Sequence, residues 1–198
     1  MRRRTGSSAR FLVALLVAAL TVGFAAPTAK AAIATPTGGE GALQIDFQNF
    51  FFPLAAKKIS ATPIPPAFID FTTGEVKFPV TGGVYETRTM IGAVQLAGGL
   101  RMAKYNSDFT AVEKTIDVTN IRIVNGRELN GDAFGLVPSP AADLEDRTIS
   151  NPSRSSTVFT AANVRVNALS APVLNLYFDT DAFVAGTRMG AFRANIEH

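Results

Sequence analysis

The sequence predicts a mainly β protein, built as an antiparallel sandwich-like or barrel-like domain with one or two short helices. After residue 31 the chain is rich in Phe, Val, Ile and Thr, which favour strands over helices. Turn signals built from Gly, Pro and Asn recur about every ten residues, a spacing typical of sandwiches and barrels. No segment has helical periodicity over the length that a helical bundle requires.

Residues 1–31 have the layout of a secretory signal peptide. Four arginines precede an uncharged apolar run from Phe11 to about Ala26, and Ala29-Lys30-Ala31 follows as a small-x-small cleavage site. The run is shorter than the roughly 20 residues that a membrane span needs. We therefore expect cleavage, no stable membrane span afterwards, and a protein that is secreted, either released or associated with the cell surface.

Composition excludes several classes of function. The first 31 residues hold five of the 19 Lys and Arg and none of the 16 acids, so the remainder has 14 basic and 16 acidic residues and a net charge of −2. Without a basic patch, we expect no nucleic-acid partner. The chain has no cysteine, and its one histidine is the last residue, His198, which argues against a serine triad and against zinc or copper sites. We expect no catalytic residue and no metal site.

The remaining chain divides into a flexible tether and one domain. Residues 32–41, AIATPTGGEG, are small and Gly/Pro-bearing and predict the tether, so the domain spans 42–198. Short helices are expected after Pro53 and over 171–178, the second with Ser170 as its N-cap. Residues 137–156 hold prolines, hydroxyls and charges with little apolar periodicity, which predicts a mobile polar excursion. The expected strands are 42–47, 76–80, 90–96, 99–103, 116–123, 157–166 and 192–196.

Four local features refine this pattern. Pro79 indicates an edge or bulged position. The apolar phase changes between Val118 and Ile121, which predicts a bulge near Asn120. Asn125-Gly126 is typical of a tight hairpin turn, and Asn130-Gly131 is a second turn candidate.

Three segments carry a resemblance to a known family. FTTGEVKFPVTGGVYETRTMIGAVQLAGGLRM, then KTIDVTNIRIVNG, then LSAPVLNLYFDTDAFVAGTRMGAFRANI are similar to the haem-transport-associated (HtaA-like) domain of secreted and surface proteins of Gram-positive bacteria. The likeness covers about residues 42 to 198. It implies a β-rich domain that binds haem at the cell surface through a Tyr in the first segment and a His after the glycine hairpin.

This sequence departs from both positions. The tyrosine position matches Phe50, and the histidine position matches Leu96 or Tyr105, depending on where a gap is placed. We therefore expect a non-catalytic binding or structural module without a cofactor, whose ligand-pocket candidates are Phe50, Leu96, Tyr105 and Tyr85. Its partner would be an apolar small molecule or a cell-surface component.

Two alternatives stay open. Tyr105 or Tyr85 could hold haem iron as tyrosinate. Acid clusters could instead serve a carboxylate-dependent hydrolase that acts outside the cell. The clusters are Asp143, Glu145 and Asp146, and the pair Asp179 and Asp181.

Overall fold

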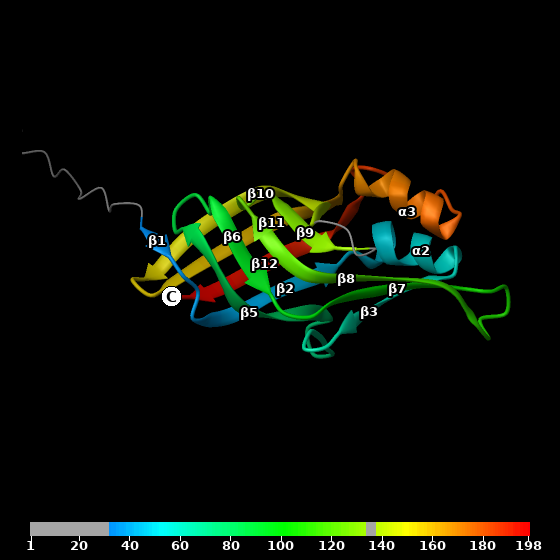
Figure 1. Cartoon of the computed structure of the whole chain (residues 1–198), viewed down its shortest axis with the longest axis horizontal. Coiled ribbons are helices and arrows are strands. Elements are labelled where there is room, and N and C mark those ends of the chain that lie inside the picture. Colours follow the sequence, from blue (N-terminus) through cyan, green and yellow to red (C-terminus); the bar gives the residue numbers. More distant parts are fainter. Residues whose placement is uncertain (1–31, 134–137) are drawn as a thin grey trace, which may run out of the picture. The chain divides into compact units, whose positions relative to one another are not determined.

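In the described part of the chain, the fold is an antiparallel β-barrel with two short helices and one π-helical turn (Figure 1). The computed structural model describes residues 32–133 and 138–198, so the expected signal peptide lies outside the described residues. The strands are β1 Ile33–Ala34, β2 Gly38–Ile45, β3 Ile59–Ile64, β4 Phe68–Asp70, β5 Glu75–Glu86, β6 Gly92–Leu96, β7 Gly99–Tyr105, β8 Val112–Val124, β9 Glu128–Asp132, β10 Ser139–Ser153, β11 Ser156–Val166 and β12 Arg188–Glu197. The helical elements are the π-helical turn η1 Phe47–Phe51, α2 Phe52–Ala56 and α3 Ser170–Phe178.

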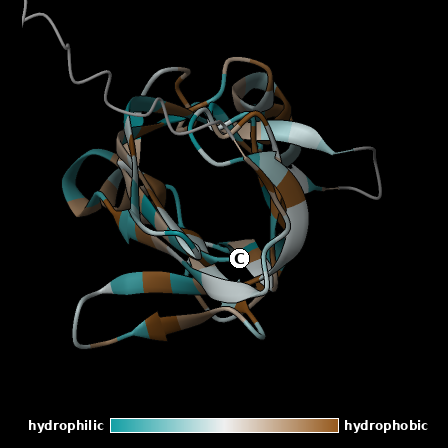
Figure 2. Cartoon of the chain, turned by 90° about the vertical axis from the view of Figure 1, so that its left-hand side faces the viewer, coloured by the Kyte–Doolittle hydropathy of each residue, from teal (hydrophilic) through white to brown (hydrophobic). Residues whose placement is uncertain are grey.

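Eight strands close the barrel in the order β5, β2, β12, β11, β10, β9, β8 and β6, with β6 pairing back to β5. Seen end-on, these strands form a ring (Figure 2). The expected β class is confirmed, and the barrel is the form adopted. No helix in the described ranges is long and apolar enough to cross a membrane.

Strand β6 closes the ring only along short stretches of the two strands that it joins, β5 and β8. This strand pairs with β5 only along residues 80–85 and with β8 only along 122–124. The first part of β8 instead pairs with β7, which in turn pairs with β3, and the first part of β5 pairs with β4. The walls β5 and β8 therefore separate toward the end of the barrel that carries α2 and α3 (Figure 1).

Alternation along β12 shows how the sequence fills the barrel. Phe192, Ala194 and Ile196 are buried, whereas Arg193 and Asn195 are exposed, as the period of two in the sequence predicts. The same inward faces from the other strands complete one large apolar core. Packing of this core stabilises a chain that has no disulfide.

The strand irregularities follow the sequence in three places. Asn120 has a left-handed φ of 49°, and the β8–β9 register shifts between Thr119 and Arg122, so the bulge is confirmed. Asn125 and Gly126 have φ of 50° and 58°, which is the mirror-image turn expected of this pair. A register shift between Val80 and Gly82 follows Pro79 in β5.

The second turn candidate is wrong, because Asn130 and Gly131 lie inside β9. Gly131 pairs with Ser139 of β10, and a Cβ at this glycine would lie 2.5 Å from Val118 Cγ1. This glycine permits close packing against β8. Because glycine occurs both in turns and at close contacts within strands, it does not by itself identify a turn.

Residues expected to form a flexible tether belong in part to the sheet. Residues 33–34 pair with β5, and residues 38–41 are the first half of β2. Gly39 has φ +121°, and a Cβ there would lie 2.1 Å from the backbone oxygen of Asn195 on β12. Its lack of a side chain permits close strand pairing rather than flexibility.

The expected polar excursion is also ordered strand over most of its length. Residues 139–153 form β10, which pairs with β11 as a long hairpin. Only Ala142 and Leu144 of this strand are buried, so its sequence lacks the apolar alternation that identifies a strand. The Thr148 and Thr160 hydroxyls hydrogen-bond across the hairpin at 2.5 Å. Residue 137 lies outside the described part of the chain.

The helix expected over 171–178 is confirmed, but its N-cap residue differs from the predicted one. Leu169 is the N-cap of α3, and Ser170 is its first helical residue. The Ser170 hydroxyl donates to the backbone oxygens of Ala141 and Asn167, each at 3.1 Å. This contact ties the start of α3 to β10.

An acidic side chain fixes the turn η1 at the end of β2. The Asp46 carboxylate accepts hydrogen bonds from the backbone N and the Nδ2 of Asn49, each at 2.9 Å, and pairs with Arg188 Nη1 on β12 at 2.6 Å. The Asn49 hydrogen bonds, and then Arg188, lower the pKa of Asp46 from 3.8 to about 2. The turn is thus anchored to two adjacent barrel strands.

Two neighbouring glycines of β5 provide a test of close strand packing. At Gly83, φ is +114° and a Cβ would lie 2.1 Å from the backbone oxygen of Ala93, whereas at Gly82 the nearest atom is the Gln95 side-chain oxygen at 3.5 Å. We expect Gly83→Ala to lower the free energy of unfolding by about 2–4 kcal/mol and Gly82→Ala by less than about 0.5 kcal/mol, measured by urea denaturation. Equal losses in the two variants would contradict the described packing.

A second test concerns the charge on Asp46. Its pKa is lowered by folding, so the charge stabilises the fold above about pH 4, and this stabilisation is lost as pH falls through about 2. We expect Asp46→Asn to reduce the urea midpoint at pH 7 and the difference from wild type to shrink at pH 2. Glu113→Gln, at an exposed position of β8, is the control and should change neither midpoint. A difference that is constant across this pH range would refute the role given to the charge.

Candidate functional site

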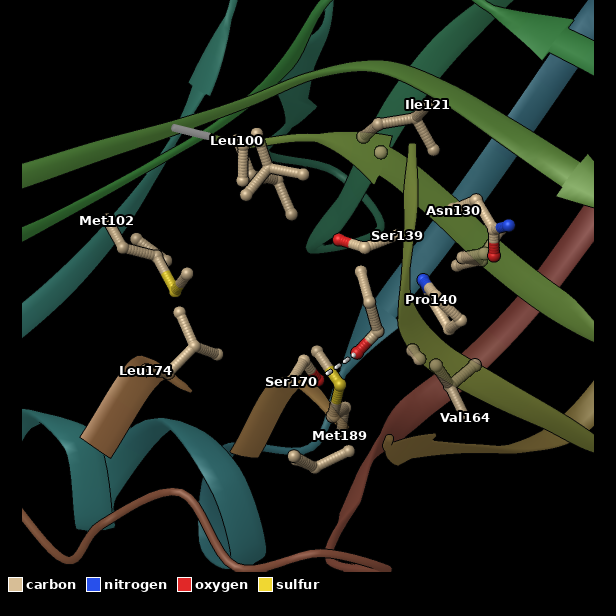
Figure 3. A pocket seen from close by; sticks show the side chains of 18 of the residues that line it. Leu100, Met102, Ile121, Asn130, Ser139, Pro140, Val164, Ser170, Leu174 and Met189 are labelled. Carbon is tan, nitrogen blue, oxygen red and sulfur yellow. Dashed lines mark hydrogen bonds between the residues drawn. The ribbon is translucent and has the colours of Figure 1, made fainter. Parts of the chain in front are cut away.

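A pocket of about 470 Å³ lies inside the barrel beside α3 (Figure 3). Residues from β2, β3, β5, β7–β12, η1 and α3 line it, and nearly all of them are apolar. The lining residues are Leu43, Ile45, Phe50, Ala61, Phe78, Leu100, Met102, Ile116, Val118, Ile121, Leu129, Asn130, Gly131, Ala133, Ser139, Pro140, Ala141, Ala142, Val164, Val166, Leu169, Ser170, Val173, Leu174, Phe183, Met189 and Phe192.

The separation of β5 from β8 explains where the pocket lies. Ala61 of β3, Leu100 and Met102 of β7, and Ile116 from the first part of β8 line it. Strands β3 and β7 and this part of β8 form the extension of the sheet beyond the closed ring. Small residues leave space along the opposite wall, where β9 and β10 contribute Gly131, Ala141 and Ala142, and where Ala133 directly follows β9. The cavity is therefore a product of the topology and of short side chains together.

Helix α3 forms one wall, and several contacts hold it against the barrel. Leu174 projects from this helix toward the pocket (Figure 3). The Asn175 amide exchanges two hydrogen bonds with the backbone of Phe183, at 2.8 and 2.9 Å. The Tyr177 hydroxyl donates to the backbone oxygen of Thr115 at 2.6 Å, and Lys104 Nζ donates to that of Phe178 at 2.6 Å. The Tyr177 and Lys104 bonds connect α3 to β8 and β7, and the Asn175 bonds connect it to the segment that follows it.

Three polar side chains occur in the described lining, and none of the residues there is ionisable. The Ser170 hydroxyl is already bonded to backbone oxygens. Ser139 directs its hydroxyl toward the pocket (Figure 3), but the residue is exposed, so this hydroxyl is accessible to water. The Oδ1 atom of Asn130 is buried and also lacks a partner in the described part of the chain.

The structure does not bring the four expected pocket residues together. Phe50 lines the pocket from η1. Leu96 is 3% exposed and lies in the main core, where its side chain approaches Gly41. Tyr105 ends β7 with its ring centroid 6.1 Å from that of Phe109. Tyr85 does not line the pocket either.

Tyr85 is enclosed at the end of the barrel opposite α2 and α3. It is 1% exposed, and its ring centroid lies 6.1 Å from that of His198, edge to face. Burial raises the pKa of its hydroxyl, an effect that the nearby Thr157 hydroxyl partly opposes. A buried phenol with a raised pKa keeps its proton, which disfavours the tyrosinate form.

The acid clusters lie outside the pocket, and four of their five carboxylates have a hydrogen-bond or ion-pair partner. Asp143 accepts a hydrogen bond from Asn167 at 2.7 Å, and Glu145 pairs with Arg165 at 2.6 Å. Lys57 pairs with Asp181 at 2.7 Å and lowers the pKa of that carboxyl. Among the described residues, no group of three or more His, Asp or Glu side chains could hold a metal ion.

Most pocket residues were missed by sequence reasoning. Met102, Met189, Leu174 and Ser139 were not singled out, because strand residues that line a cavity alternate in the same way as strand residues that fill a core. The same-face spacing of Leu100 and Met102 was the available signal, and it indicates an inward face without showing whether that face meets a void.

Two solved structures from Corynebacterium glutamicum share this fold. The C-terminal domain of HtaA aligns with a TM-score of 0.58 and 16% identity, over 82% of this chain and 98% of that chain. The heme binding protein HtaB aligns with a TM-score of 0.50 and 14% identity, over 85% of this chain and 96% of that chain. No protein-family model and no curated protein matches the sequence. The fold implied by the sequence resemblance is thus confirmed, and the chain folds as an HtaA-like domain.

Proposed function

We propose that this chain is a secreted, non-catalytic binding module that holds an apolar small molecule in the pocket beside α3. The observation that carries the proposal is a cavity of about 470 Å³ whose described wall has three polar and no ionisable side chains. Pockets of this size and composition are typical of small-molecule sites. Removing apolar ligand surface from water there supplies binding energy of roughly 25 cal/mol for each Å².

Haem is the ligand that the similar structures suggest, since HtaB is described as a heme binding protein. The residues of this pocket do not fit an iron-ligated haem. Phe50 stands at the position that matches the family tyrosine, and phenylalanine has no atom that can bind iron. The described wall contains no His or Tyr, and its two thioethers, Met102 and Met189, are weak ligands when no stronger one accompanies them.

The haem propionates raise a second difficulty. Each is a carboxylate, and a propionate that entered the apolar part of the pocket would be buried without a cation, which is costly. No Lys or Arg occurs in the described wall of the pocket. The two tyrosines considered as alternatives do not help, since Tyr85 is enclosed in the core and Tyr105 lies outside the pocket wall.

A matched pair of variants on α3 tests the binding proposal. Diphenylhexatriene is an uncharged hydrocarbon that fluoresces when it leaves water. We expect the purified protein to bind it saturably, and Leu174→Trp to weaken binding at least about ten-fold by filling the cavity, which corresponds to about 1.4 kcal/mol. Leu176→Trp is the control, because Leu176 is 85% exposed on the same helix and does not line the pocket. Equal affinities of the two variants for diphenylhexatriene would show that it binds outside this pocket.

Hemin titration tests the absence of iron ligation. We expect no sharp Soret band and no one-to-one end point with the purified wild-type protein, because the pocket offers neither His nor Tyr to iron. A sharp band that Tyr105→Phe or Tyr85→Phe abolished would instead establish haem binding through that tyrosine. A sharp band that Leu174→Trp abolished would show that haem enters the pocket despite its wall.

A further inference from the structure

We infer, on the basis of the proposed function, that Met102 and Met189 form an oxidation-sensitive modification site in the pocket wall, and that conversion of their thioethers to sulfoxides lowers the affinity of the pocket for an apolar ligand. The chain has four methionines, Met1 among them, and two of the other three line the pocket. It has no cysteine, so the methionines carry all of its sulfur. Oxidants that act on sulfur therefore have methionine as their only target in this chain.

Accessibility distinguishes these two methionines from the one in the core. Met102 and Met189 are partly exposed and point into the open space of the pocket (Figure 3), whereas Met90 is 1% exposed and packs in the large apolar core. Leu169 and Val173 also line the pocket and are 69% and 49% exposed, so the pocket opens to solvent beside the start of α3. A small water-soluble oxidant can enter by this opening and reach the two thioethers, but it cannot reach Met90.

The two thioethers come from different walls of the pocket. Met102 lies in β7 and pairs with Ala61 of β3 and with Ile116 of β8, which line the pocket as well. Met189 lies in β12 and packs against both the large core and the second cluster around α2 and α3. Its backbone oxygen accepts a hydrogen bond from Asp46 N at 2.7 Å, which fixes its place beside η1. A change of polarity at these two side chains therefore alters two parts of the wall.

A peroxide is the class of oxidant that this site would take. A lone pair of the thioether sulfur attacks one oxygen of hydrogen peroxide, so that an S–O bond forms and the O–O bond breaks. The sulfur loses two electrons and becomes a sulfoxide, and the departing hydroxide takes the proton of the transferred oxygen and leaves as water. The step needs no protein group besides the thioether, which suits a wall that has no ionisable side chain in its described part.

A sulfoxide is poorly matched to this wall. Oxidation replaces a flexible apolar side chain by a polar one whose oxygen accepts hydrogen bonds. The described wall has no Lys or Arg, and the Ser170 hydroxyl already donates to backbone oxygens. The sulfoxide oxygen would therefore keep water in the pocket, and an apolar ligand would have to remove that water without replacing its hydrogen bond.

Peroxide treatment of the purified protein tests the site. Peptide mass spectrometry locates the added oxygen, and diphenylhexatriene fluorescence measures the affinity of the pocket before and after treatment. We expect Met102 and Met189 each to gain one oxygen well before Met90 does, and diphenylhexatriene binding to weaken at least about ten-fold. Far-ultraviolet circular dichroism should stay unchanged, because the strands do not depend on either sulfur atom.

Matched variants assign the effect to the two thioethers. The double variant Met102→Leu with Met189→Leu removes the oxidisable sulfur and nearly preserves the side-chain volume. We expect it to bind diphenylhexatriene within about three-fold of wild type and to keep that affinity after peroxide treatment. Met90→Leu is the control, because it removes only the buried methionine, and peroxide should weaken its binding as in wild type.

The outcomes separate the two proposals. Failure of diphenylhexatriene to bind the untreated protein would overturn the proposed function, and this inference with it. If the untreated protein binds the probe, the inference alone is overturned when peroxide that oxidises free methionine leaves Met102 and Met189 unmodified, or when both are oxidised without loss of affinity. An equal loss of affinity in the double variant, or unfolding of the treated wild-type protein, would also overturn it, because the effect would then not arise from the pocket wall.

Discussion

The short pairing of β6 between β5 and β8 is the constraint on which the site depends. Along this pairing the sheet closes, and the apolar side chains of facing strands meet in a continuous core. Beyond it β5 and β8 take other partners, and their inner faces are too far apart to be filled by their own side chains. A second core cluster, formed around α2 and α3, covers that end of the barrel. The pocket lies between the two packed regions.

Polar contacts keep this arrangement in place, and of the side chains that make them only Ser170 lines the pocket. The carboxylate of Asp46 anchors η1 to β12, Tyr177 and Lys104 attach α3 to the sheet extension, and Ser170 ties that helix to β10. Each of these four side chains has a hydrogen-bond or ion-pair partner within the protein. The cavity surface is thereby left almost wholly apolar, which suits a ligand held by shape and burial.

Much of the fold could be predicted from the sequence, because alternation along strands such as β12 and the phase change at Asn120 are direct consequences of strand geometry. The segments wrongly expected to be turns, a tether or an excursion share one cause: glycine and polar residues were interpreted as loop signals. Gly39 and Gly131 permit close approach of strands, and most polar residues of β10 are exposed.

The pocket was not predictable in detail. Leu100, Met102 and Phe192 have the alternation of core residues, and only the separation of strands that are distant in sequence makes them line a void. Of the expected site residues, Phe50 alone reaches it.

A crystal structure with a brominated long-chain alcohol would test the central claim most directly, because bromine can be located by its anomalous scattering. The account predicts bromine inside the wall formed by Leu100, Leu174 and Phe192. Bromine found only on the outer surface, or a barrel interior filled by side chains from the same walls, would contradict it.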